Sequence, residues 1–186
     1  AEYDEHYHSV HGAIQESQHV FINAGFKDKL HSQNEILILE IGFGTGLNFI
    51  LSFAHCEANN IHLNYTGIEA FPLTRDTIEE TDYAKYVSPK IWEKFINKYD
   101  ATLLAKQNLS SLCQLTIAHT TIITFNSKEK FDVIYYDAFS VQHQPEMWTN
   151  EMIAHACSFL KVGGIFVSYA ITGNLKRAVK ACGFTI

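Results

Sequence analysis

Residues 36–49, ILILEIGFGTGLNF, decide the fold predicted for this chain. Their first six residues form a short apolar run, which is typical of a strand buried on both faces of a parallel sheet. Gly42, Gly44 and Gly46 follow, and such glycines let the chain turn sharply and let backbone N–H groups approach a ligand closely. The next residues, 47–58, have the apolar spacing of a helix. Strand, glycine loop and helix together predict an α/β fold with a nucleoside-type ligand.

The rest of the chain continues to alternate strand and helix patterns. We expect further strands at 61–68, 112–125, 131–136 and 164–170, and helices at 73–109, 145–160 and 174–182. This order predicts a doubly wound α/β domain over residues 31–186, whose last strand begins at 184–186 and is incomplete. Residues 1–30 lie outside the alternation. They predict a small N-terminal extension packed on the domain, with 18–22 as a candidate hairpin strand.

Two of the predicted helices carry end signals. Ser88 can cap a helix that has Pro89 at its first position. The helix at 145–160 is followed by the pair Gly163-Gly164, and glycine is common just beyond a helix end. We therefore expect this helix to close there, immediately before the next strand.

Composition excludes several classes of protein. The chain has 186 residues, 47% of them hydrophobic and 18% charged, which fits one folded domain and not a disordered segment. No apolar run reaches the roughly 18 residues of a membrane span, and the polar, acidic start does not resemble a signal peptide. Cys56, Cys113, Cys157 and Cys182 are widely spaced, without a CxxC pair. We expect reduced thiols and a cytoplasmic protein.

The net charge of −6 argues against a strongly basic nucleic-acid binder. Of the 14 basic residues only Arg75 and Arg177 are arginines, whose planar fork suits phosphate best. One interpretation is a local contact of Arg75, or of the cluster Lys176, Arg177 and Lys180, with phosphate. The other is that these residues lie on solvated helix faces.

The spacing of the glycine loop favours one class of cofactor. The loop reads G-x-G-x-G, with Leu47 where a dinucleotide-binding motif would place its third glycine. This tighter pattern, led by the acidic Glu40, is the one that adenosyl-methionine methyltransferases use. Glu69 ends the second predicted strand, where a carboxylate can accept both hydroxyl groups of a ribose. The alternatives are a plain structural turn for the glycines and a solvated strand end for Glu69.

Asp137 follows the strand at 131–136, and ligands of doubly wound folds bind outside the carboxyl ends of the strands. Amino-group methyltransferases place an Asp/Asn-Pro-Pro-aromatic motif here, with an acidic or amide residue first; this chain has Asp137-Ala138-Phe139-Ser140 at that position. A carboxylate that accepts an N–H bond can orient an attacking amine and take up its charge. An aromatic ring beside it can stack on a base or cover the methyl group. The alternative is that Asp137 only caps a turn.

Several stretches of the chain resemble one known family. They are Tyr7-His8-Ser9 with Gly12, Glu16 and 20–21; GFGTGLNF at 42–49; EAFPL at 69–73; and DAFSVQHQPEMW at 137–148, with further agreement through 160–164 and 176–184. Together they resemble the methyltransferase domain of the bacterial tRNA 5-methylaminomethyl-2-thiouridine biosynthesis proteins, the MnmC-like group, in a stand-alone form. The resemblance implies a Rossmann-like class I methyltransferase that depends on S-adenosyl-L-methionine.

The resemblance also implies a reaction and the residues that carry it. The methyl group passes to the 5-aminomethyl group of the wobble uridine of certain tRNAs, and a separate oxidase is expected to supply that aminomethyl group. The residues implied for cofactor binding are Glu40, Gly42, Gly44, Gly46, Asn48, Glu69 and Ala70. Among them the glycines would hold the methionine part and Glu69 the ribose. Asp137 would face the transferred methyl group, and Phe139 is the second residue implied as catalytic.

Two departures from the family pattern leave other functions open. Thr120-Thr121 stand where the family commonly has Gly-Asp, and Ser140-Val141 where it has Ala-Pro. The acidic charge and the shortage of arginine favour a methyltransferase for a small amine as an alternative. A non-catalytic tRNA- or cofactor-binding protein is another alternative, because Thr121 replaces a carboxylate expected near the adenine amine.

Three histidines near the start, His6, His8 and His11, have a spacing that metal sites use. No cysteine or carboxylate pattern supports a metal there, and histidines are numerous in this chain. We therefore predict no metal site.

Overall fold

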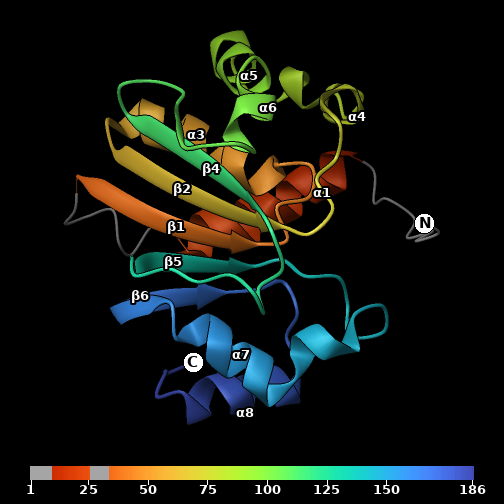
Figure 1. Cartoon of the computed structure of the whole chain (residues 1–186), viewed down its shortest axis with the longest axis vertical. Coiled ribbons are helices and arrows are strands. Elements are labelled where there is room, and N and C mark those ends of the chain that lie inside the picture. Colours follow the sequence, from red (N-terminus) through yellow and green to blue (C-terminus); the bar gives the residue numbers. More distant parts are fainter. Residues whose placement is uncertain (1–9, 26–33) are drawn as a thin grey trace.

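The computed structural model describes residues 10–25 and 34–186, which contain a six-stranded sheet (Figure 1). The strands are β1 (Glu35–Ile41), β2 (His62–Glu69), β3 (Gln107–Asn108), β4 (Cys113–His119), β5 (Phe131–Tyr136) and β6 (Leu160–Val167). Their order across the sheet is β3-β4-β2-β1-β5-β6. All neighbours are parallel except β3 and β4, which are antiparallel. The predicted doubly wound, mostly parallel sheet is confirmed.

Helices cover both faces of this sheet. They are α1 (Val10–Ser17), the π-helix η1 (Gln18–Ala24), α3 (Leu47–Asn59), α4 (Arg75–Glu79), the 3₁₀ turn η2 (Tyr83–Lys85), α5 (Pro89–Ile96), α6 (Tyr99–Thr102), the 3₁₀ turn η3 (Pro145–Trp148), α7 (Asn150–Cys157) and α8 (Gly173–Ala181). Side chains of α1, η1, α3 and α5 pack into one buried cluster, and those of α7 and α8 into another. The helices that follow β1 and β2 therefore lie on one face, and those that follow β5 and β6 on the other.

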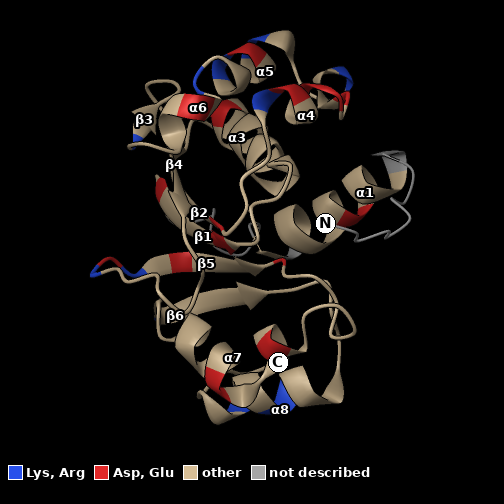
Figure 2. Ribbon diagram, turned by 45° about the vertical axis from the view of Figure 1, so that its right-hand side comes forward, with Lys and Arg blue, Asp and Glu red and all other residues tan. Residues whose placement is uncertain are grey.

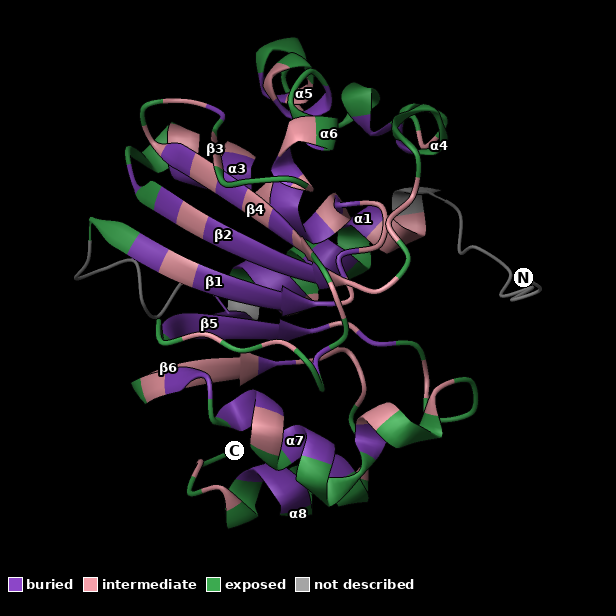
Figure 3. Cartoon of the chain, in the orientation of Figure 1, coloured by how far each residue is buried: buried purple, intermediate pink, exposed green. Residues whose placement is uncertain are grey.

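The two clusters explain the apolar run of β1. Successive side chains of a strand point to opposite faces of the sheet. Ile36 and Ile38 belong to the cluster under α3, whereas Leu39 and Ile41 belong to the cluster under α7 and α8. Because both faces are covered, nearly every position of this strand is buried (Figure 3). Glu40 shares the α3 face with Ile38, which places its carboxyl group beneath the start of α3.

The helical stretch predicted at 73–109 is present as several short helices as far as Thr102, but the prediction is wrong at its end, where residues 107–108 form β3. Asp82 has a left-handed backbone (φ 62°), which interrupts the chain between α4 and η2. The hydroxyl of Ser88 accepts a hydrogen bond from the N–H of Ile91, and Pro89 occupies the first position of α5. The start predicted for this helix is thus confirmed.

The glycine pair at 163–164 was assigned to a helix end, and this prediction is wrong. Helix α7 ends at Cys157, and both glycines lie inside β6. The pairing of β6 with β5 has a register shift near Phe131, and Gly163 has φ +73°. A Cβ atom on Gly164 would lie 2.9 Å from the backbone oxygen of Lys161. The glycines therefore serve an irregularity in a strand, which is their other common use.

Three further boundaries differ from the predictions. Residues 18–22 are helical and not a strand, because Phe21 and Ile22 are buried where η1 packs against α3 and β6. Residues 120–125 form a turn after β4, held by N–H groups of residues 124 and 125 that donate to the backbone oxygen of Thr121. Residues 184–186 form no strand, because Gly183 (φ +91°) turns the chain away at the end of α8.

The described part of the N-terminal extension, residues 10–25, packs on α3. The boundary placed near residue 30 remains a prediction, because it lies outside the described residues. Within 10–25 and 34–186, none of the helices has the length and apolarity that a bilayer crossing requires. The four cysteines are free thiols, and all except Cys182 are buried.

Candidate active site

The crevice between β1 and β5 is where the direction of strand order reverses. From β1 the chain passes through α3 to β2 on one side, and from β5 it passes through α7 to β6 on the other (Figure 1). Ligands of doubly wound folds bind at such a point, outside the carboxyl ends of the strands. We call this side of the sheet, to which β1, β2, β4, β5 and β6 all run, the carboxyl edge. The glycine loop leaves β1 here, and Asp137 leaves β5.

The glycine loop is a tight, hydrogen-bonded turn. The N–H groups of Gly42 and Phe43 both donate to the backbone oxygen of Ile68, each over 3.1 Å, and the N–H of Gly46 donates to that of Phe43 over 2.9 Å. Gly42, Gly44 and Gly46 have φ values of +88°, +51° and +79°. These left-handed conformations suit glycine and strain other residues.

The three glycines differ in what surrounds them. A Cβ atom on Gly42 would lie 2.5 Å from the backbone oxygen of Asp137, and one on Gly46 would lie 3.1 Å from two phenylalanine rings. No described atom lies within 4 Å of the Cβ position of Gly44. The first and third glycines are thus needed for packing, whereas the second borders open space in which a ligand can approach the backbone.

The side chain of Phe43 attaches the glycine loop to the buried core. Its ring is buried and packs over Gly67 of β2, where a Cβ atom would lie 2.3 Å from the ring. The ring also lies 6.2 Å from that of Phe49 and 6.4 Å from that of Phe95, centre to centre. The loop is therefore fixed to the core and is held ready for a ligand.

Glu69 lies beside the glycine loop, as its position at the end of β2 predicts. Its Oε2 accepts a hydrogen bond of 2.9 Å from the N–H of Gly44, and its Oε1 accepts one of 3.0 Å from the N–H of Phe71. Each carboxylate oxygen retains a second lone pair for a ligand. Contact with a ribose remains a prediction.

Asn48 joins two carboxyl groups at the centre of the crevice. Its Nδ2 donates to Oε1 of Glu40 and to Oδ2 of Asp137, both over 2.8 Å. The hydroxyl of Ser17, at the end of α1, donates to its Oδ1. The hydroxyl of Tyr65 donates to the other oxygen of Glu40 over 2.8 Å. The Oδ1 side of the amide thus faces Ser17, and the NH₂ side faces the two carboxyl groups.

Both carboxyl groups hold their protons more tightly than usual. Burial raises the pKa of Glu40 well above its ordinary value, and the nearby Asp137 raises it further. Burial raises the pKa of Asp137 from 3.8 to about 7, the hydrogen bond from Asn48 lowers it, and the charge of Glu16 raises it. Within the described ranges neither group is in an ion pair with a basic side chain. The crevice therefore favours a ligand that carries positive charge.

Two of these partners were not predicted from the sequence. Ser17 lies in the N-terminal extension, outside the strand–helix alternation, and 31 positions from Asn48. Tyr65 lies within an apolar strand, where a tyrosine usually indicates only packing. A third contact, between the hydroxyls of Thr45 and Tyr83 over 2.9 Å, ties the loop to η2.

Phe139 lies two residues beyond Asp137 and is about half exposed, at 48%. Its N–H donates to Oε1 of Gln144 over 3.2 Å, and its backbone oxygen accepts from Nε1 of Trp148 over 2.8 Å. The backbone of Phe139 is therefore held on both sides. Ala70, which follows Glu69, is partly buried at the same edge.

Thr120 and Thr121 are the two residues at which the sequence resemblance leads one to expect Gly-Asp. The N–H of Thr120 donates to the backbone oxygen of Glu69 over 3.1 Å. The hydroxyls of both threonines lie 2.8 and 2.9 Å from that of Thr124. They build a turn at the carboxyl edge and leave it without a carboxylate at these two positions.

The side chains of the three histidines with metal-like spacing, for which we predict no metal site, lie outside the described part of the structure. His6 and His8 are not described, and nothing is described of the side chain of His11. Among the described residues, no three His, Cys, Asp or Glu side chains come together in a way that could hold a metal ion.

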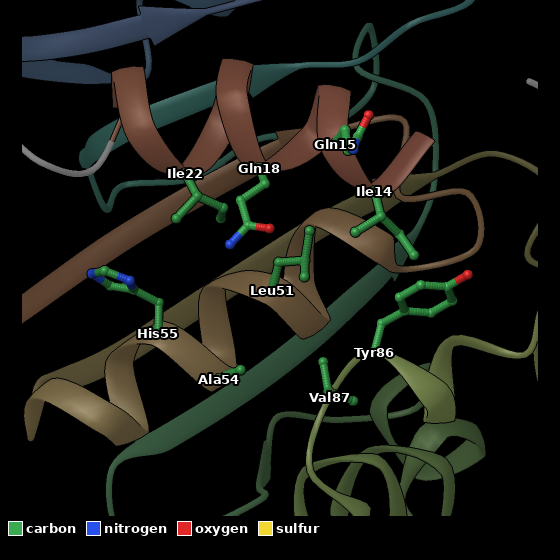
Figure 4. A pocket seen from close by; sticks show the side chains of 9 residues that line it. All are labelled: Ile14, Gln15, Gln18, Ile22, Leu51, Ala54, His55, Tyr86 and Val87. Carbon is green, nitrogen blue, oxygen red and sulfur yellow. The ribbon is translucent and has the colours of Figure 1, made fainter. Parts of the chain in front are cut away.

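A separate groove of about 440 Å³ runs between α1–η1 and α3 (Figure 4). It is lined by Ile14, Gln15, Gln18, Ile22, Leu51, Ala54, His55, Tyr86 and Val87. The side chains from α3 point into it from one side and those from α1 and η1 from the other, with Tyr86 and Val87 at one end. None of the residues of the crevice lines this groove, so it is not the site built around Asp137.

Comparison with known proteins agrees with this geometry. Residues 79–186 match the model of a family described as S-adenosyl-L-methionine-dependent methyltransferase. The bifunctional tRNA 5-methylaminomethyl-2-thiouridine biosynthesis protein MnmC of Leptospira borgpetersenii is 28% identical over 99% of this chain and 30% of its own length. That of Paraburkholderia xenovorans is 25% identical over 98% of this chain and 30% of its own length.

The chain thus spans about 30% of the length of these relatives. The crystal structure of MnmC2 from Aquifex aeolicus superposes with a TM-score of 0.71 at 20% identity, over 93% of this chain and 55% of that one. This likeness confirms the fold. The resemblance to the MnmC-like group that the sequence motifs indicate is also confirmed.

Proposed function

Because this chain belongs to the S-adenosyl-L-methionine-dependent methyltransferase family, we propose that it methylates the nitrogen of the 5-aminomethyl group on the wobble uridine of tRNA. The relatives named for tRNA 5-methylaminomethyl-2-thiouridine biosynthesis support this substrate. One observation carries the proposal: Asn48 holds the carboxyl groups of Glu40 and Asp137 together at the strand crossover of the sheet. A carboxylate at this place, next to the cofactor, can orient an attacking amine and accept its proton.

The residues of the crevice fit the cofactor. S-adenosyl-L-methionine, when bound, supplies an electrophilic methyl group on a positively charged sulfur. Gly44 borders open space and presents backbone to it, between the packed Gly42 and Gly46. Glu69 stands beside the loop with lone pairs available for ribose hydroxyls. Glu40, Asn48 and Ala70 complete the set, and the two buried carboxyl groups favour a cationic ligand.

Asp137 is the proposed acceptor of the amine proton. An amine attacks only through a free lone pair, so its nitrogen must be neutral when it reacts. A carboxylate that accepts an N–H bond holds that nitrogen in place and takes the proton that the nitrogen loses on methylation. The pKa of Asp137, raised to about 7, suits a general base near neutral pH. Phe139 follows it and would cover the reacting amine.

The remaining parts of the proposal concern partners and place. We propose that a separate oxidase supplies the aminomethyl group and that the reaction takes place in the cytoplasm.

A small amine is the second candidate substrate. The net charge of −6 and the presence of only two arginines favour it over a large polyanion. Figure 2 shows the Lys and Arg positions of the described residues spread over separate parts of the ribbon, including α4, α5 and α8.

A competition assay separates the two substrates. The purified chain receives cofactor with a labelled methyl group, together with tRNA that carries 5-aminomethyluridine and a mixture of small primary amines. We expect label in the wobble nucleoside after digestion and mass spectrometry. Label only in small amines would support the second candidate, and cofactor binding without any transfer would support a non-catalytic role.

A further inference from the structure

More than half of the exposed large apolar side chains of the described residues follow strand ends at the carboxyl edge. Among the described residues, nine large apolar side chains are exposed. Five of them follow the ends of parallel strands: Phe71 after β2, Ile123 after β4, Phe139 and Val141 after β5, and Ile171 after β6. Single exposed apolar residues are ordinary, but a cluster around a ligand site indicates an interaction surface.

Hydrogen bonds hold the backbone of the two exposed phenylalanines, Phe71 and Phe139. Phe71 is 85% exposed, while its N–H donates to the carboxylate of Glu69. Phe139 is held by Gln144 on one side and by Trp148 on the other. Phe71 thus follows Glu69 by two residues and Phe139 follows Asp137 by two residues, both at the carboxyl edge. Both side chains are therefore exposed from backbone that is fixed by hydrogen bonds.

The proposed substrate has the chemistry to cover such rings. The wobble nucleotide lies in a single-stranded loop, whose bases are unpaired. Single-stranded RNA is recognised largely by stacking of its bases on aromatic side chains. Stacking also suits this chain because, with a net charge of −6, it has few cations to follow a phosphate backbone.

We propose that Phe71 and Phe139 form a stacking surface for unpaired bases of the RNA loop that carries the target nucleotide, with Ile171 beside them. This inference rests on the proposed function, and it names the residues that recognise the RNA.

Helix α8 adds a place for phosphate to the same surface. It begins at Gly173, two residues after Ile171, and the side-chain amide of Asn174 donates to the backbone oxygen of Trp148 over 3.2 Å. Arg177 folds back along the helix, so that its Nη1 lies 3.3 Å from the Cβ position of Gly173. The guanidinium group is thus turned toward the carboxyl edge, where it can meet a phosphate next to a stacked base.

The test compares RNA binding with cofactor binding in single variants. RNA binding is measured by fluorescence anisotropy with a labelled tRNA anticodon stem–loop, and cofactor binding by calorimetry with S-adenosyl-L-homocysteine. The variants are Phe71→Ala, Phe139→Ala and Arg177→Ala, with Val162→Ala as the control. Val162 is fully exposed near the start of β6, at the opposite edge of the sheet.

We expect each phenylalanine variant to weaken RNA binding by about 5-fold or more, a typical loss for one stacked base. Phe71→Leu and Phe139→Leu are expected to behave like the alanine variants, since a stacked base needs the ring. Arg177→Ala should lower the slope of log Kd against log salt by about 1. Val162→Ala should bind RNA like the wild type. The affinity for S-adenosyl-L-homocysteine should change less than two-fold in all variants.

Three results decide against parts of this reasoning. In the first, the wild type binds and methylates RNA, and both phenylalanine-to-alanine variants bind RNA as tightly as the wild type. This result would overturn the stacking surface and leave the proposed function standing. Loss of cofactor affinity in Phe71→Ala with normal RNA affinity would assign that ring to the adenosine. A wild-type protein that neither binds nor methylates RNA would overturn the proposed function itself.

Discussion

Replacement of Asp137 by asparagine should stabilise the folded protein at alkaline pH while it abolishes most of the activity. The carboxyl group lies in the crevice, and its pKa is raised from 3.8 to about 7, mainly by burial. The folded state therefore binds the proton more tightly than the unfolded state. The contribution of the Asp137 carboxyl group to the stability of the wild type is fully present below about pH 4 and is lost as the pH rises through about 7.

The size of this loss follows from the shift. A change of about 3 pKa units corresponds to about 4 kcal/mol at about 1.4 kcal/mol per unit. Asp137 keeps part of its surface exposed to solvent, so water screens some of this free-energy penalty. We expect Asp137→Asn to be more stable than the wild type by about 2–4 kcal/mol at pH 8 and by much less near pH 4. The asparagine oxygen can still accept the hydrogen bond from Asn48.

Urea unfolding followed by tryptophan fluorescence at a series of pH values measures this difference. The matched control is Asp132→Asn, on the same strand. Asp132 is also buried, but its carboxylate accepts hydrogen bonds from the N–H of Leu37 over 2.9 Å and from the ammonium group of Lys161. Its replacement weakens an ion pair and should destabilise the protein, the opposite sign. A constant difference between wild type and Asp137→Asn from pH 4 to pH 8 would refute the reasoning.

The same variant should lose about 10²-fold or more in single-turnover methylation, with the affinity for the uncharged S-adenosyl-L-homocysteine nearly unchanged, because one proton-accepting group is removed. Glu69→Ala should weaken binding of S-adenosyl-L-methionine by about ten-fold or more in calorimetry, since charge-assisted hydrogen bonds to the ribose contribute about 1.5–3 kcal/mol each; a change below two-fold would place the ribose elsewhere. Gly42→Ala should lower the melting temperature far more than Gly44→Ala, because only the first Cβ meets backbone, at 2.5 Å, while both should impair cofactor binding. Ser17→Ala should lower the turnover about 5-fold, because the amide of Asn48 loses the partner that orients it, and Ser17→Thr should restore it; equal rates in all three proteins would assign Ser17 to packing alone.

The part of the site that the sequence predicts lies on contiguous residues. Residues 36–49 contain a strand, a glycine loop and a helix in immediate succession, so local pattern and ligand chemistry coincide. Glu69 and Asp137 are predicted for a related reason. Glu69 ends one predicted strand and Asp137 directly follows another, and parallel strands of one sheet end at the same edge. No knowledge of side-chain packing is needed for these positions.

What the sequence does not reveal depends on contacts across the fold. Ser17 meets Asn48 only because α1 packs on α3, and a single serine in a polar extension carries no signal of its own. Gly163 and Gly164 fit a helix end and a strand irregularity equally well in sequence. The structure decides between them, because β5 and β6 pair with a shifted register there.

Without a ligand, ionisation of the two carboxyl groups of the crevice, Glu40 and Asp137, is unfavourable because burial disfavours their charged forms. Glu40 is almost fully buried, and the pKa values of Glu40 and Asp137 are both raised by burial. A bound cation relieves this, since an opposite charge favours the ionised carboxylates. S-adenosyl-L-methionine carries a positive sulfur that S-adenosyl-L-homocysteine lacks. The first ligand should therefore gain affinity relative to the second as the pH rises through about 7, where Asp137 ionises.

Calorimetry with both ligands between pH 6 and pH 8 tests this link between the buried charges and cofactor choice. The ratio of the two affinities should rise with pH in the wild type and stay flat in Asp137→Asn, which has no proton to lose. A ratio that rises equally in both proteins would mean that another group senses the sulfur charge. Because Asn48 lowers the pKa of Asp137 through its hydrogen bond, Asn48→Ala should move the rise to higher pH. The amide that joins the two carboxyl groups would then set the pH at which the crevice accepts its charged cofactor.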